Sequence, residues 1–206
     1  MGQRSNRGWW YYFPVAFALK TPLPSMLAWF AALLSSVGGR RRGLEGRIEA
    51  LLLLVPVLYL ASSMGSVLNI GYRHLLPTLP FMYIYAGRLA PFIGEVFPRR
   101  RGLWRTALVV GAVAILAVWL ACGTLSVAPH YLAYFNTVAG GPDGGWRYLV
   151  DSNLDWGQDL PALQAYLDER ELGPLREPVY LSWFGSTYPH LYGLDISYRL
   201  LPSHFA

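Results

Sequence analysis

The stretch TALVVGAVAILAVWLACGTLSVA, residues 106–128, decides the class of this fold. It lies in an interval between Arg105 and Asp143 that contains no formal charge. A helix needs roughly 20 predominantly apolar residues to cross about 30 Å of hydrocarbon. The stretch meets that requirement, so it predicts a transmembrane helix over residues 106–127.

Three further apolar stretches are long enough to cross a membrane. Two of them contain no charge, whereas the last contains Arg88, Glu95 and three prolines. Both charges lie toward its C-terminal end, where a long side chain can reach the interface. We therefore expect a mainly α membrane protein with about four transmembrane helices in residues 1–127. The first three cover residues 21–39, 50–68 and 75–97.

Composition excludes several other classes of protein. The 206 residues are 54% hydrophobic and 14% charged, whereas a soluble domain is about a quarter charged. An aromatic content of 15% excludes a disordered chain, and the single Cys122 excludes an internal disulfide framework. The basic residues stand between apolar segments and do not line one face, so no nucleic-acid partner is expected.

Two short arginine-rich loops predict the orientation of the chain. Four arginines stand between the first two expected spans and four between the last two, so with four spans both loops lie on one side. Short basic loops face the cytoplasm. Residues 66–74, the segment before Lys20 and everything after about Ala128 are then outside. The loop arginines are Arg40, Arg41, Arg42, Arg47, Arg99, Arg100, Arg101 and Arg105.

The last part of the chain, residues 128–206, is expected to form a small exterior α/β module. Residues 1–142 have a charge balance of +10, from 13 Lys and Arg against 3 Asp and Glu, but the remainder is acidic. Short strands are predicted over 147–150 and near 179–183. Between them, DLPALQAYLDER predicts an amphipathic helix capped by Asp159, with Pro161 in its first turn. This order predicts a βαβ unit with a right-handed crossover.

Three cationic candidates stand at the predicted outer face of the membrane. Lys20 immediately precedes the first span, and Arg73 and His74 immediately precede the third. Cations that converge at this depth suit a lipid phosphate or diphosphate beside an apolar channel. The alternative is ordinary interfacial snorkelling. His74 as a metal ligand is a weaker interpretation, because no second ligand is spaced nearby on the same element.

Two further groups are candidate substrate-binding residues. Tyr11 and Tyr12 belong to the run GWWYYFP, which otherwise indicates an aromatic belt at the headgroup level. Polar side chains also follow the predicted strand over 147–150, where they could contact a substrate. The alternative there is a helix-capping loop, and the run lacks the glycine and glutamate of a calcium loop. These polar residues are Asp151, Asn153 and Asp155.

Three stretches, residues 8–24, 69–81 and 129–167, resemble bacterial membrane glycosyltransferases of family 39. These are related to the dolichyl-phosphate-mannose–protein mannosyltransferases. The resemblance implies the GT-C class, whose many-helix members transfer a sugar from a polyprenyl-phosphate carrier to a protein, lipid or glycan acceptor outside the cytoplasm. It also implies that Lys20, Arg73 and His74 hold the phosphate of the donor, which is a lipid-linked sugar.

One feature of that family has no counterpart in this sequence. Its catalytic acidic residue lies in a first extracytoplasmic loop, whereas the acidic residues before Asp143 are Glu45, Glu49 and Glu95, all on the predicted cytoplasmic side. No catalytic residue or metal ligand is therefore assigned. A divalent metal is considered as a cofactor only for the complete enzyme.

The chain is expected to be a C-terminal fragment of such an enzyme and inactive alone. It would be a multi-pass protein of the bacterial plasma membrane, with its C-terminal module outside. The alternative function is a non-enzymatic four-helix anchor that presents an extracytoplasmic binding module.

Overall fold

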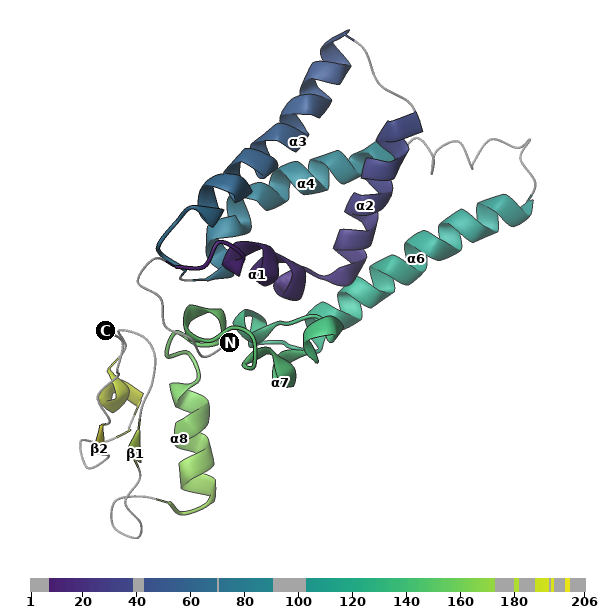
Figure 1. Cartoon of the computed structure of the whole chain (residues 1–206). Helices are drawn as coiled ribbons and strands as arrows, with labels where there is room; N and C mark the ends of the chain where they lie inside the picture. The colour runs from purple at the N-terminus through teal and green to yellow at the C-terminus, as the bar shows by residue number, and fades with distance from the viewer. Residues whose placement is uncertain are drawn as a thin grey trace. The chain divides into compact units, whose positions relative to one another are not determined.

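The protein, seen here in a computed structural model, is mainly helical (Figure 1). The chain divides into two compact units, Met1–Leu149 and Val150–Ala206. Residues 128–149, which the sequence assigns to the exterior module, belong to the first unit. The structure describes residues 8–38, 43–69, 71–90, 103–172, 180–181, 188–192, 194 and 199–200.

The first unit consists of helices joined by short connections. The 3₁₀ helices η1 and η2 flank the short helix α4, so the chain is helical through most of residues 72–90. The elements are α1 (Tyr12–Lys20), α2 (Leu23–Gly38), α3 (Gly43–Met64), η1 (Tyr72–Thr78), α4 (Leu79–Ala86), η2 (Gly87–Leu89) and α6 (Leu103–Leu125).

Two helices are long and apolar enough to cross a membrane. They cover Gly43–Met64 and Thr106–Leu125, with mean hydropathies of 1.6 and 2.4. A third span results if α1 and α2 are taken together, although the chain bends by 109° between them. The expected mainly α membrane class is thus confirmed, with two or three such helices in the described residues. The rest of the stretch expected to span 75–97, after Ala90, lies outside those residues.

The bend between α1 and α2 follows from the sequence TPLP. A residue that precedes proline disfavours the helical conformation, because the proline ring collides with its backbone. Thr21 precedes Pro22 and is extended, with φ −80° and ψ 133°, so α1 ends at Lys20. The helix α2 then begins at Leu23 with a new direction.

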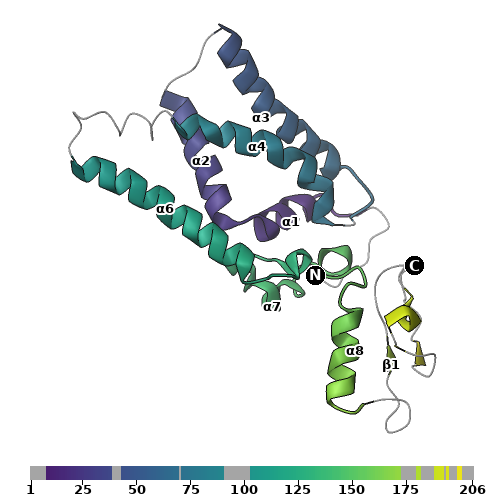
Figure 2. The ribbon, with the colours of Figure 1, turned by 180° about the vertical axis from the view of Figure 1, so that it is seen from behind.

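The short helix α4 lies between α2 and α3 and packs against both (Figures 1 and 2). The helix α6 contacts α2. Buried side chains from α1, η1 and α4 form the core of the unit, among them Phe13, Leu75, Met82 and Tyr85. Most side chains of α3 and α6 remain exposed, as expected for helices whose apolar surfaces contact lipid.

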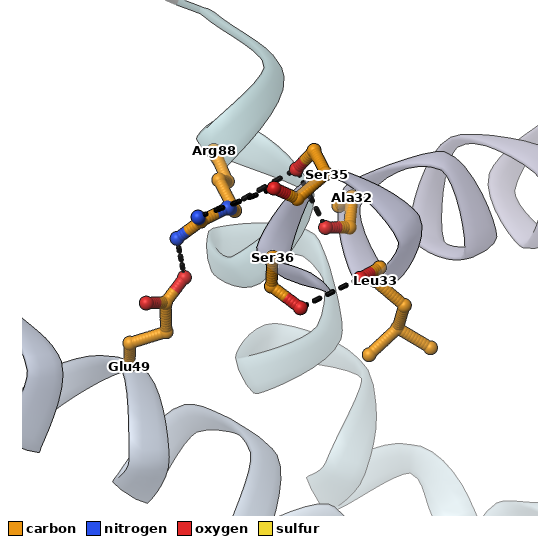
Figure 3. A network of polar contacts seen from close by, with 6 residues as sticks. All are labelled: Ala32, Leu33, Ser35, Ser36, Glu49 and Arg88. Carbon is orange, nitrogen blue, oxygen red and sulfur yellow. Dashed lines mark hydrogen bonds and ion pairs between the residues drawn. The ribbon is translucent and has the colours of Figure 1, made fainter. Parts of the chain in front are cut away.

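Arg88 joins three helical elements at one end of this unit (Figure 3). Its guanidinium forms an ion pair with Glu49 of α3, and its Nε donates to Ser35 Oγ of α2 over 3.1 Å. We call Ser35, Glu49 and Arg88 the Arg88 end. The C-terminal part of α2, the N-terminal part of α3 and η2 therefore meet there. The orientation predicted from the arginine loops requires this arrangement, but the loop residues 40–42 and 99–101 lie outside the described part of the chain.

The second unit has its own small core. Helix α8 (Leu160–Glu169) begins after Asp159 and has Pro161 in its first turn, as predicted, although Asp159 forms no side-chain capping bond. Strands β1 (Tyr180–Leu181) and β2 (Arg199–Leu200) pair in parallel. The 3₁₀ helices η5 (Asp151–Asn153) and η6 (Pro189–Tyr192) complete the described elements. The core consists of Leu160, Leu167, Leu181 and Leu194.

The predicted strand over 147–150 is absent. The amides of Arg147, Tyr148 and Leu149 donate to the carbonyls of Gly144 and Gly145 at 3.0–3.2 Å, which makes a series of turns. Those amides are therefore not available to a strand partner. The strand predicted near 179–183 is present in part, as β1. The parallel pair that the structure describes is β1 with β2, so a strand–α8–strand unit is not formed by residues 147–150.

Candidate functional site

The C-terminal end of α1 is capped by a residue more than a hundred positions away. The last carbonyls of a helix need donors from elsewhere. Asn136 supplies them: its Nδ2 donates to Ala18 O over 2.7 Å and to Thr21 O over 3.0 Å. Its backbone amide donates to Leu19 O over 2.9 Å. The fully buried Asn136 thus fixes residues 131–136 to α1.

The glycine-rich run AGGPDGG holds Asn136 and its neighbour Phe135 in place. Gly140 and Gly141 have φ values of 81° and 71°, which favour glycine, and Gly141 N donates to Asn136 O over 3.1 Å. A Cβ atom on Gly145 would lie 2.2 Å from the Phe135 ring. The run is therefore a tight turn against which the buried Phe135 ring packs.

Lys20, the last residue of α1, is buried against Leu132 and Phe135. Its side chain is 7% exposed, and its Nζ donates to Leu132 O over 2.7 Å. The ammonium group also lies 4.5 Å from the centre of the Phe135 ring, in a cation–π arrangement. Neither of these two partners, a carbonyl oxygen and an aromatic ring, carries a formal charge.

A second contact brings η1 to the same place. Thr21 Oγ1 and Tyr72 Oη share a hydrogen bond of 3.0 Å. Burial raises the pKa of the Tyr72 hydroxyl to about 12, so this group is neutral at physiological pH. The bond joins the residue after Lys20 to the residue before Arg73. We call Lys20, Thr21, Tyr72 and Asn136 the Lys20 end.

Arg73 and His74 follow Tyr72 in η1. Arg73 is exposed, whereas His74 is half-buried and its ring lies 6.2 Å from the ring of Phe13. The Nε2 atom of His74 is buried and forms no hydrogen bond with the residues that the structure describes. Lys20 thus ends α1, whereas Arg73 and His74 lie in η1. The hydrogen bond between Thr21 and Tyr72 joins the residues that follow Lys20 and precede Arg73 in sequence.

An apolar cavity of about 210 Å³ begins at Thr21 and continues between α2, α4 and α6. Apart from Thr21, Ser25 and Tyr83, its walls are largely apolar side chains, which include two methionines, Met26 and Met82. Thr21 both lines this cavity and bonds to Tyr72. The cavity and the Lys20 end therefore share Thr21. Its apolar walls include Pro24, Trp29, Met82, Leu116 and Leu120.

The two candidate tyrosines belong to an aromatic cluster at the start of α1. The Tyr11 ring lies 5.6 Å from the Trp9 ring and 5.8 Å from the Trp10 ring. The Tyr12 ring lies 5.2 Å from the Phe13 ring. Both tyrosines are half-buried. This clustering agrees with the aromatic-belt interpretation and leaves their substrate-binding role a prediction.

The polar run of the second unit organises the loop that precedes α8. Asn153 is buried and its Nδ2 donates to Val150 O over 3.1 Å, while Asp155 Oδ1 accepts from Gly157 N over 2.8 Å. Asp151 begins η5. These bonds are those of a capping loop, the alternative that the sequence leaves open. A substrate-binding role for the three residues stays a prediction.

Sequence reasoning proposed Lys20, Arg73 and His74, whose role at a phosphate stays a prediction, and it did not single out Asn136 and Phe135, which pack around Lys20. Nothing in the sequence distinguishes Asn136 from an ordinary loop asparagine. Among the described residues, no three His, Cys, Asp or Glu side chains are grouped so that they could hold a metal ion. No protein-family profile, curated protein or solved structure matches this chain.

Proposed function

We propose that this chain is part of an integral-membrane glycosyltransferase of the family-39 type, which transfers a sugar from a polyprenyl-phosphate donor to an acceptor outside the cytoplasm. One observation carries the proposal: the apolar cavity meets the cationic Lys20 end at Thr21, which belongs to both. An amphiphile with an apolar tail and an anionic head needs these two environments side by side. The resemblance of three sequence stretches to that family selects a polyprenyl phosphate from such amphiphiles.

The contacts of the Lys20 end suit a phosphate. Lys20 is held by Leu132 O and by the Phe135 ring, so its charge is fixed in position before a ligand arrives. Arg73 is exposed and has the fork of N–H donors that matches phosphate oxygens. The buried Nε2 of His74 is a third polar atom close to α1. The tail of the donor would lie along the cavity walls.

In the transfer reaction the acceptor oxygen bonds to the anomeric carbon of the sugar, and the bond from that carbon to the phosphate oxygen breaks. The acceptor proton passes to a base, and negative charge develops on the departing phosphate. Fixed cations lower the energy of that charge. We assign this role to Lys20 and Arg73.

The base is not assigned to the membrane part of this chain. Glu49 is paired with Arg88 at the opposite end of the unit. We therefore expect the purified chain to show no sugar transfer from a polyprenyl-phosphate donor. Measurable turnover would contradict this assignment and direct attention to Asp151 and Asp155.

Binding of a polyprenyl phosphate, compared with the polyprenol of the same length, tests the proposal. We expect the purified chain in detergent to prefer the phosphate. Arg73→Ala removes a charge-assisted contact, so it should weaken phosphate binding about ten- to a hundredfold. Arg47→Ala is the matched control, since Arg47 is an exposed arginine near the start of α3, and should change binding by less than about twofold. Equal binding of phosphate and alcohol, or equal effects of the two variants, would reject the phosphate site.

The second candidate function is a membrane anchor that presents the exterior module. It is favoured by the separate core of the second unit, formed by Leu160, Leu167, Leu181 and Leu194. A membrane anchor is not expected to bind a polyprenyl phosphate more tightly than a polyprenol. The same binding experiment therefore separates the two functions. For both candidate functions, we propose that the chain lies in the bacterial plasma membrane with the second unit outside the cytoplasm.

A further inference from the structure

Residues 131–149 lie alongside the last turns of α6. They include the short helix α7 (Pro142–Gly145), which lies beside the end of α6 in both views (Figures 1 and 2). A small cavity of about 110 Å³ is lined by Trp119 and Gly123 of α6 and by residues of this segment, among them Tyr134. A Cβ atom on Gly123 would lie 4.0 Å from Tyr134 Oη. The segment therefore folds back against α6.

The same segment is fixed to the start of α2. Leu23, the first residue of α2, lines the same small cavity, and Asn136 Nδ2 donates to Thr21 O over 3.0 Å. The end of α6 and the start of α2 therefore lie at one level. In a helix that crosses a membrane, such an end lies where the hydrocarbon meets the headgroups. Residues 131–149 are held at that depth by two helices.

The composition of the segment suits this depth. Only two of its residues, Asp143 and Arg147, have a formal charge. Tyr131, Val138 and Trp146 are 55%, 67% and 58% exposed, although their side chains are largely apolar. Large apolar side chains exposed in one short segment favour an interaction surface. Tyrosine and tryptophan are enriched at membrane interfaces, because their rings are apolar and their O–H and N–H groups remain hydrated.

Two observations favour lipid as the partner of this surface. The guanidinium of Arg147 lies 5.5 Å from the centre of the Trp146 ring, and a long basic side chain there reaches lipid phosphates while its stem stays in apolar surroundings. The exposed apolar surface of α6 also extends to the segment, because Trp119 is 40% exposed and lines the small cavity. A bilayer that contacts α6 therefore meets the segment as well.

We propose that this segment is an interfacial anchor whose Tyr131, Val138 and Trp146 side chains insert among the lipid headgroups. The anchor also fixes the depth of Lys20, because the Lys20 ammonium group donates to a carbonyl of the segment over 2.7 Å. The inference depends on α2 and α6 crossing the membrane and not on the proposed sugar transfer.

Spin labelling of the full-length chain in vesicles of phosphatidylcholine and phosphatidylglycerol tests the depth of the segment. Cys122→Ala removes the only cysteine, and a label is then attached at Val138→Cys or at Trp146→Cys. Collision rates are measured with O₂, which concentrates in hydrocarbon, and with a water-soluble nickel chelate. We expect the ratio of the first rate to the second to be several-fold higher at both positions than at Ala165→Cys, an exposed position of α8. Ile115→Cys, in the middle of α6, gives the value for hydrocarbon and should be higher still.

Val138→Cys leaves every aromatic side chain in place, so it decides the matter if Trp146→Cys weakens the anchor. A ratio at position 138 equal to that at position 165 would place the segment in water and overturn the proposal. Low collision rates with both reagents at position 138 would show a surface covered by protein, which would overturn it as well. So would an aqueous value at Ile115→Cys, because the depth of the segment is derived from α6.

Discussion

Each end of the first unit contains a largely buried cation, and the two cations are satisfied in different ways. Arg88 pairs with the carboxylate of Glu49, whose charge offsets its own. Lys20 engages the carbonyl of Leu132 and the ring of Phe135, which carry no formal charge. Burial of a cation alone therefore does not identify an anion-binding site. The nature of the partner decides whether a cation can still act on a ligand.

The two ends also differ in how the chain assembles them. The contacts of Arg88 join residues 39 and 53 positions apart, all within neighbouring helices. The contacts of Lys20 and Asn136 join residues 112 to 118 positions apart. The Lys20 end therefore forms only when residues 131–136 pack against α1.

The largest effect is expected from removing the carboxylate at the Arg88 end. Glu49→Ala removes the carboxylate that pairs with Arg88, and in that pair the two side chains are only 18% and 9% exposed. We expect a loss of about 3 kcal/mol in the free energy of unfolding, at the low end for a buried pair. Thermal unfolding in detergent measures it.

Replacing both members of this pair by leucine is the control. The double variant leaves no lone charge, so it should be much closer to the wild-type protein than Glu49→Ala. A double variant that is less stable than Glu49→Ala would mean that Glu49 does not stabilise the fold by neutralising Arg88. The difference described between the Arg88 end and the Lys20 end would then be wrong.

Asn136→Ala tests the assembly of the Lys20 end. It removes the two side-chain bonds to Ala18 O and Thr21 O and leaves these carbonyls buried. We expect a loss of about 2 kcal/mol in the free energy of unfolding. Polyprenyl-phosphate binding should weaken as well, because Lys20 loses its fixed position. Thr137→Ala, at the neighbouring exposed position, is the control and should change neither quantity. Similar results for both variants would mean that Asn136 does not cap α1.

A smaller effect is expected from Gly145→Ala. The added methyl group would lie 2.2 Å from the Phe135 ring, so the ring must move. We expect a loss of about 1 to 2 kcal/mol in stability, typical of overpacking. Gly111→Ala is the control, because nothing lies near that position in α6 and alanine favours a helix. It should leave stability unchanged or raise it. Destabilisation by Gly111→Ala and not by Gly145→Ala would contradict the packing described for Phe135.

The sequence was sufficient for features that depend on composition and on neighbouring residues. Charge-free runs predicted α3 and α6, and Pro161 predicted the start of α8. The sharp bend at Thr21 was not expected, although Pro22 explains it, because a proline restricts the preceding residue without fixing the new direction.

Features that depend on distant residues were not predicted. A short strand was predicted over residues 147–150, but the amides of Arg147 and Tyr148 donate to the carbonyls of Gly144 and Gly145. The ion pair of Arg88 with Glu49 of a different helix was not predicted either, because it depends on how α3 packs beside η2. No sequence pattern identified Asn136 as a capping residue, because its role depends on the position of α1.

We expect a lipid-linked phosphate to bind at the Lys20 end and not at the Arg88 end. The most direct test is photo-crosslinking with a polyprenyl phosphate that has a photoreactive group next to the phosphate, followed by peptide mapping. We predict labelling of residues 20–21, 72–74 and 131–136, and its loss when unlabelled polyprenyl phosphate is added in excess. Labelling centred on residues 45–52 and 84–90 would contradict the claim.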